Sequence, residues 1–125
     1  MKRLATVVLL AGLVVGVRTP MHAHHSFAAT YFEDKEQTIE GQMVQFMYRN
    51  PHSFVHVLDK QNVRWAIEWG GGGQLSRQGV TRDTLKYGDQ VVITGSPGRN
   101  AADHRLRLRS ILRPKDGWKW AGIVE

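Results

Sequence analysis

The chain has 125 residues, 42% of them apolar and 22% charged, which suffices for one small domain with an ordinary hydrophobic core and argues against a disordered chain. It contains no cysteine, and this excludes disulfide frameworks, thiolate zinc sites and thiol nucleophiles. Its 17 basic side chains exceed its 11 acidic ones and give a formal net charge of +6.

The first 23 residues are expected to form an export signal. A short basic start precedes an uncharged, apolar stretch over residues 4–17, shorter than the roughly 20 residues that a membrane-spanning helix needs. Arg18 ends this stretch, and Ala23 supplies a small residue for cleavage. We therefore expect a signal-peptide helix over residues 1–23 and a periplasmic or secreted bacterial protein. An uncleaved anchor helix is the alternative.

Cleavage after Ala23 would lower the formal net charge of the chain. The removed segment carries three basic side chains, at positions 2, 3 and 18, so the formal net charge falls from +6 to +3. Much of the basic character therefore belongs to export, and we expect no nucleic-acid partner. Contact with a membrane is expected only through the uncleaved signal peptide.

The remaining chain divides into three parts. Residues 24–37 mix polar, aromatic and acidic side chains and are expected to form an N-terminal arm. Residues 38–115 carry the strand patterns of a single domain, and residues 116–125 are expected to form a C-terminal tail.

The domain pattern predicts a small barrel that is mainly β. The alternation of the first predicted strand breaks near Met43, as it does in a bulged or strongly coiled strand. A short helix is expected over 74–78, after the glycine run 70–73, which we interpret as a turn that ends the third strand. This order is typical of a five-stranded OB-like barrel with one short helix between strands 3 and 4; an open sheet or half-sandwich is the alternative. The predicted strands cover residues 38–48, 53–58, 63–69, 90–95 and 104–112.

Four stretches of the sequence carry a resemblance. They are His24–Ala28 (HHSFA), Arg49–His52 (RNPH), Trp65–Glu68 (WAIE) and Gly79–Val91. Together they resemble a family of small exported bacterial proteins of uncharacterised function, over almost the whole chain from His24 to about residue 113. The resemblance implies an OB-like barrel in the periplasm, and it implies no established activity, substrate or partner.

The histidines are candidate metal ligands. Cleavage after Ala23 would make His24 the first residue, so that its amine and ring nitrogen could bind one ion. A second histidine would complete a T-shaped set suited to Cu(II). We therefore consider a copper site of His24, His25 and His52. The alternative is a flexible polar lead into the domain, with the His52 ring bonded to a backbone carbonyl.

Two further residues of the second and third predicted strands are singled out. Glu68 shares a strand face with Arg64, which predicts an ion pair on a solvated face. Glu68 would instead be a carboxylate ligand beside His52 if the two strands pair. His56 is expected to be a buried, hydrogen-bonded histidine.

A basic stripe marks the fifth predicted strand. Arg105, Arg107 and Arg109 alternate along it and therefore point to one face. Such a face could bind an anionic glycan or lipid head group, or it could carry charges that protect an edge strand from aggregation.

Catalysis finds little support in the sequence. Ser26 lies next to His25, but neighbours in a chain seldom face each other, and no orienting acid is evident. We therefore expect a non-enzymatic binding or accessory protein of the periplasm, with an unknown protein or small molecule as its ligand. Copper handling through the N-terminal histidines is the alternative.

Overall fold

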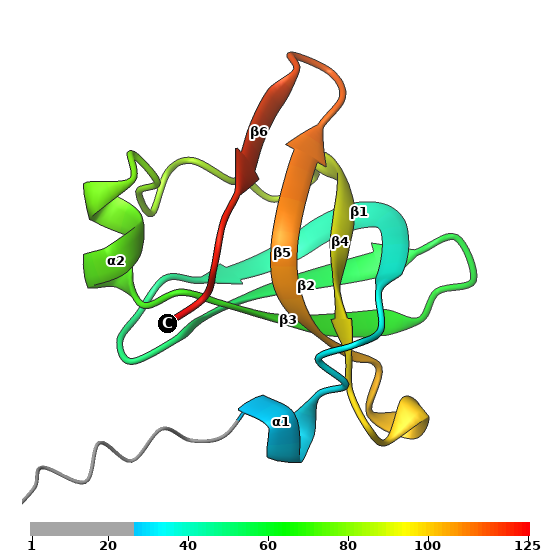
Figure 1. The fold of residues 1–125 in the computed structure, drawn as a ribbon. Coiled ribbons are helices and arrows are strands. Elements are labelled where there is room, and N and C mark those ends of the chain that lie inside the picture. Colours follow the sequence, from blue (N-terminus) through cyan, green and yellow to red (C-terminus); the bar gives the residue numbers. More distant parts are fainter. Residues whose placement is uncertain (1–26) are drawn as a thin grey trace, which may run out of the picture.

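The computed structural model describes residues 27–125, so the predicted signal segment and His24 and His25 lie outside the described residues. None of the helices in the described part of the chain is long and apolar enough to cross a membrane. In chain order the elements are α1 (Phe27–Thr30), β1 (Gln37–Met47), β2 (Ser53–Asp59), β3 (Arg64–Trp69), α2 (Gly72–Arg77), β4 (Gln90–Pro97), the 3-10 turn η1 (Ala101–Asp103), β5 (Arg105–Arg113) and β6 (Trp118–Ala121) (Figure 1).

The strands close into a barrel. Hydrogen bonds join them in the order β3-β2-β1-β4-β5-β6, and an additional parallel pairing between β3 and β5 closes the first five strands on themselves. The predicted five-stranded OB-like barrel with a short helix between strands 3 and 4 is confirmed, and the open-sheet alternative is wrong. Figure 1 shows α1 below the barrel, near β3, and α2 beyond the ends of β2 and β3.

The long first strand belongs to both halves of the barrel. Residues 37–42 pair with β4, and residues 41–47 pair with β2. The register with β2 shifts between Met43 and Gln45, which confirms the predicted bulge. Gly41 lies where the two pairings meet, and a Cβ atom there would come 2.3 Å from the carbonyl oxygen of Leu58. Only glycine fits this close approach of β1 to β2.

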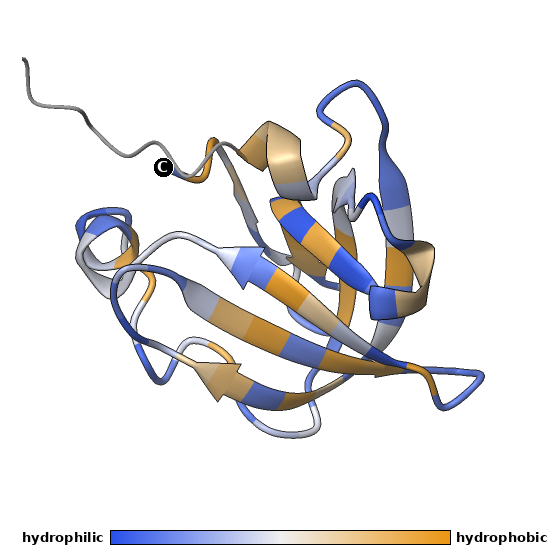
Figure 2. Cartoon of the chain, turned by 90° about the horizontal axis from the view of Figure 1, so that it is seen from below, coloured by the Kyte–Doolittle hydropathy of each residue, from blue (hydrophilic) through white to orange (hydrophobic). Residues whose placement is uncertain are grey.

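The core fills the interior of the barrel. Hydrophobic and hydrophilic residues alternate along the strands, as Figure 2 shows, and the inward side chains of all five strands are fully or almost fully buried. Trp69 is completely buried, and its ring meets that of Trp120 at 5.2 Å in an edge-to-face contact. This contact ties β6 to the core, which explains why part of the predicted tail forms a sixth strand.

The glycine run does more than end the third strand. The two glycines at 70 and 71 follow β3 and the next two begin α2. A Cβ atom on Gly71 would lie 2.4 Å from the carbonyl oxygen of Pro51. The turn between β1 and β2, which includes His52, therefore packs directly against the start of α2.

Candidate functional site

The candidate site lies on the outside of the barrel where β2, β3 and β5 meet. Phe54 of β2 pairs with Glu68 of β3, and Glu68 pairs with Arg107 of β5. Glu68 points away from the core, yet its exposed fraction is only 7%. Tyr31 of the arm, His52 and Arg105 surround its carboxylate, so that an outward strand face becomes a buried polar site.

The carboxylate of Glu68 joins three segments of the chain. The hydroxyl of Tyr31, from the arm, donates to Oε2 at 2.5 Å. The guanidinium of Arg105, at the start of β5, donates to the same oxygen at 3.3 Å. The ring Nδ1 of His52, from the turn before β2, lies 2.6 Å from Oε1. Both carboxylate oxygens therefore have partners within the protein.

His52 is held on two sides. A carboxylate oxygen only accepts, so Nδ1 is the donor of this contact, and in the neutral ring the lone pair then lies on Nε2. Nε2 makes no hydrogen bond to any residue from 27 to 125. The ring of Phe27 stacks on the imidazole with centroids 5.4 Å apart, and the guanidinium of Arg107 lies 3.7 Å from the centroid of Phe27. Phe27 thus anchors the arm between His52 and β5.

Tyr31 is the buried end of this cluster. Its pKa is raised well above the ordinary value, first because the phenol is buried and then because the carboxylate of Glu68 accepts its hydrogen bond. Arg105 opposes this shift. Tyr31 therefore stays a neutral donor at all physiological pH values.

This raised pKa predicts a stability change at alkaline pH. An unfolded tyrosine loses its proton near pH 10, whereas folded Tyr31 keeps it, so the contribution of Tyr31 is complete below about pH 10 and is lost above that pH. Urea unfolding between pH 8 and 11 should show that the stability advantage of the native chain over Tyr31→Phe shrinks above pH 10. A constant advantage up to pH 11 would contradict the assignment.

The predicted ion pair between Arg64 and Glu68 is wrong. Arg64 instead donates to Nδ1 of His56 at 3.1 Å and to Oε1 of Gln45 at 2.9 Å. The carboxylate of Glu68 bonds to Tyr31 of the arm, His52 of the turn and Arg105 of β5. β2 and β3 pair, and Glu68 lies beside His52, which is the condition that the alternative set for Glu68 as a carboxylate ligand; the ligand role itself stays a prediction.

His56 differs in part from its prediction. It has the expected hydrogen bond, with Arg64, but it lies half-buried on the outer face of β2 instead of in the core. Its pKa is lowered by partial burial, then by the charges of Arg64 and Arg49.

The basic stripe has the predicted common face, and the arm lies across it. Arg105 pairs with Glu68, Arg107 lies 3.7 Å from Glu33, and Arg109 lies 3.3 Å from Glu36. Arg109 also donates to the backbone carbonyl of Glu33 at 2.6 Å. All three arginines therefore have acidic partners within the chain, and a glycan or lipid head group would have to compete with these carboxylates.

The predicted copper set is only partly within the described residues. His52 is placed beside Glu68, whereas His24 and His25 lie outside. Within residues 27–125 no group of three or more histidine, aspartate or glutamate side chains could hold a metal ion alone. Phe27 and Tyr31 are site residues that the sequence pattern did not predict. Both are large aromatic residues of the arm within or just after the histidine motif, and this is the signal that could have identified them.

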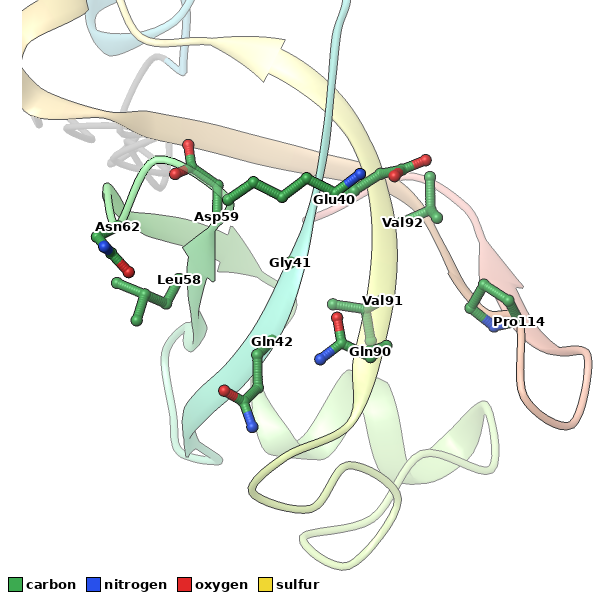
Figure 3. A pocket seen from close by; sticks show the side chains of 11 residues that line it. Glu40, Gly41, Gln42, Leu58, Asp59, Asn62, Gln90, Val91, Val92 and Pro114 are labelled. Atoms are coloured by element: carbon green, nitrogen blue, oxygen red, sulfur yellow. The ribbon is translucent and has the colours of Figure 1, made fainter.

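A separate hollow of about 360 Å³ lies over β1 and its neighbours, around Gly41 (Figure 3). Asp59 is an acidic side chain on its wall, and its carboxylate already accepts the backbone N–H groups of Gln61 and Val63 and the indole N–H of Trp65. These bonds lower the pKa of Asp59. The acid therefore holds the turn between β2 and β3 together, and we assign the hollow no chemistry.

Three comparisons with known proteins complete the description. A family described as a family of unknown function (DUF6152) matches residues 11–107. No curated protein matches the chain. Among solved structures, the crystal structure of apo TiaS (tRNAIle2 agmatidine synthetase) is similar over 63% of this chain, with 16% identity and a TM-score of 0.48. The chain matches only 18% of the length of that structure, and this likeness carries no argument about function.

Proposed function

We propose that this chain, which belongs to the family of unknown function DUF6152, is an exported, non-enzymatic binding protein. In this proposal the protein holds one Cu(II) ion with His52 and the histidines that precede Phe27. The proposal joins the two functional expectations drawn from the sequence, a binding module and a copper site.

The contact between Nδ1 of His52 and Oε1 of Glu68, 2.6 Å long, carries the proposal. A metal-binding histidine almost always donates its other ring N–H to a carboxylate, a carbonyl or water, which fixes its tautomer and makes the free nitrogen a better ligand. Glu68 is itself held by Tyr31 and Arg105, so the imidazole is oriented before any ion arrives.

The same contacts define the role of Glu68. Oε1 accepts from His52, and Oε2 accepts from Tyr31 and Arg105. Three of the roughly four acceptor sites of the carboxylate are therefore occupied, and the residue is only 7% exposed, which leaves little of it for a metal ion. We therefore assign Glu68 to positioning His52, in place of the direct ligand role considered from the sequence.

The stacking of Phe27 on His52 limits how far from His52 the preceding histidines can lie. Its ring stacks on His52, and His25 precedes it by two residues, so the Cα atoms of His25 and Phe27 can be at most about 7.6 Å apart. Cleavage after Ala23 would add the amine and ring of His24. Amine and imidazole nitrogens in a planar or T-shaped set favour Cu(II), which also binds such ligands more tightly than the other divalent first-row metals.

Mass spectrometry of the exported protein tests the proposal. The denatured chain should have the mass of residues 24–125, and the native chain should retain one copper ion after exchange into buffer with glycine as a weak competitor. The matched control carries Gly-Ser-Gly before His24, which moves the terminal amine away from the imidazoles and should abolish retention. A processed chain that keeps no copper, or a control that keeps as much, would overturn the proposal.

A further inference from the structure

An open hollow of about 580 Å³ lies beside the candidate site, on the outer face of the barrel. Arg105, which holds Glu68, forms part of its wall, so the hollow and the site are neighbours. Apolar side chains make up one part of the lining and hydrogen-bond donors the other. The apolar part is Met47, Phe54 and Ala66, and the donors are Arg49, His56 and Arg105.

Arg49 is an anchored cation with no acidic partner among residues 27–125. Its backbone N–H donates to the hydroxyl of Ser53, and its carbonyl accepts the N–H of Gly72 at 3.0 Å. Its guanidinium is exposed and lies 5.5 Å from the ring centroid of Phe54. In the part of the chain that the structure describes, this guanidinium makes no ion pair. Its five donors are therefore available to a ligand.

Two more donors, Arg105 and His56, line the same hollow. The guanidinium of Arg105 lies 6.0 Å from the centroid of Phe54 and is held there by Glu68. Nδ1 of His56 accepts from Arg64, so the proton of the neutral ring lies on Nε2. The lowered pKa of His56, caused partly by Arg64 and Arg49, indicates a positive potential in the hollow.

Asp103 is the one acidic side chain among the lining residues. Its carboxylate accepts from the side-chain amide of Asn100 at 3.2 Å and makes no ion pair within residues 27–125. Arg105 is paired with Glu68, so Arg49 is the lining arginine without an acidic partner in this part of the chain. A guanidinium binds a carboxylate through two parallel hydrogen bonds, a match that a spherical anion does not offer.

We infer that this hollow binds a small organic carboxylate, with its charged end on Arg49 and its apolar body against Phe54, Met47 and Ala66. The inference does not depend on copper, because Arg49 and His56 take no part in the proposed metal site.

Benzoate and its neutral isostere benzamide are the probes. In an NMR titration of the processed protein in metal-free buffer, benzoate should shift the backbone amides of Ala66 and His56 with saturation, and benzamide should bind at least about tenfold more weakly. Arg49→Gln should weaken benzoate binding at least about tenfold. Arg77→Gln, at an exposed position of α2, is the matched control and should leave binding unchanged.

Three results would overturn the inference. They are equal binding of benzoate and benzamide, native binding of benzoate by Arg49→Gln, and shifts confined to residues outside the hollow. Because Arg49 is exposed, its replacement should leave the fold intact, and an unchanged amide spectrum of the free variant verifies this.

Discussion

His52→Ala should weaken Cu(II) binding at least about 100-fold in the chain that begins at His24. Replacing a residue that merely orients a ligand typically costs 10- to 100-fold in metal affinity, and removal of a ligand should cost no less. His52 is the proposed ligand whose geometry is fixed within the barrel, through Glu68 and Phe27. Calorimetric titration at pH 7 against a competing chelator measures the change in Kd.

His104→Asn is the matched control. His104 has φ of 46°, and asparagine tolerates this left-handed conformation better than most residues. Its ring packs edge-on against Trp65 at 5.2 Å and takes no part in the cluster around Glu68. The control should bind copper as the native chain does. Equal Kd values for His52→Ala and the native chain would remove His52 from the metal site.

Glu68→Ala should lower the free energy of unfolding by about 2–4 kcal/mol. Its loss leaves the buried hydroxyl of Tyr31 without an acceptor, which costs about 1–3 kcal/mol, and deprives His52 and Arg105 of their common partner. The Arg105 side chain is 34% exposed and can be resolvated, which keeps the loss below that of a fully buried pair. Urea unfolding of the metal-free protein at pH 7 measures it.

Glu40→Ala supplies the comparison for this loss. Glu40 is exposed on β1, and replacement of such a residue should change the stability by less than about 0.5 kcal/mol. If the change for Glu68→Ala were equally small, the cluster would contribute nothing to holding the arm on the barrel. The orientation of His52 would then need another cause.

The barrel could be predicted because its strands alternate. Inward positions on the strands are apolar and outward positions mostly polar, so each strand pattern depends on nearby residues alone. The sixth strand was missed for the opposite reason. β6 has four residues, and its place depends on Trp120 packing against Trp69, from a strand about 50 residues earlier in the chain. A local sequence pattern cannot predict a contact between residues so far apart in the chain.

The site was predictable only in part, and Glu68 shows why. Pairing of β2 with β3 was enough to bring Glu68 near His52, and that alternative was considered from the sequence. The burial of Glu68 depends on Tyr31 and Arg105, each 37 residues away and on opposite sides along the chain. When only the sequence of β3 is considered, Arg64 is the basic residue on the same face as Glu68, and a solvated ion pair is therefore predicted. The cover that the arm provides is a tertiary property.

Pulsed electron paramagnetic resonance of the Cu(II)-loaded, processed protein tests the central claim most directly, because it detects the remote nitrogens of imidazoles bound to copper. We predict that the native chain carries one more coordinated imidazole than His52→Ala, while His104→Asn matches the native chain. The same number of coordinated imidazoles in the native chain and in His52→Ala would contradict the account, since the histidine that Glu68 orients would then not be a ligand.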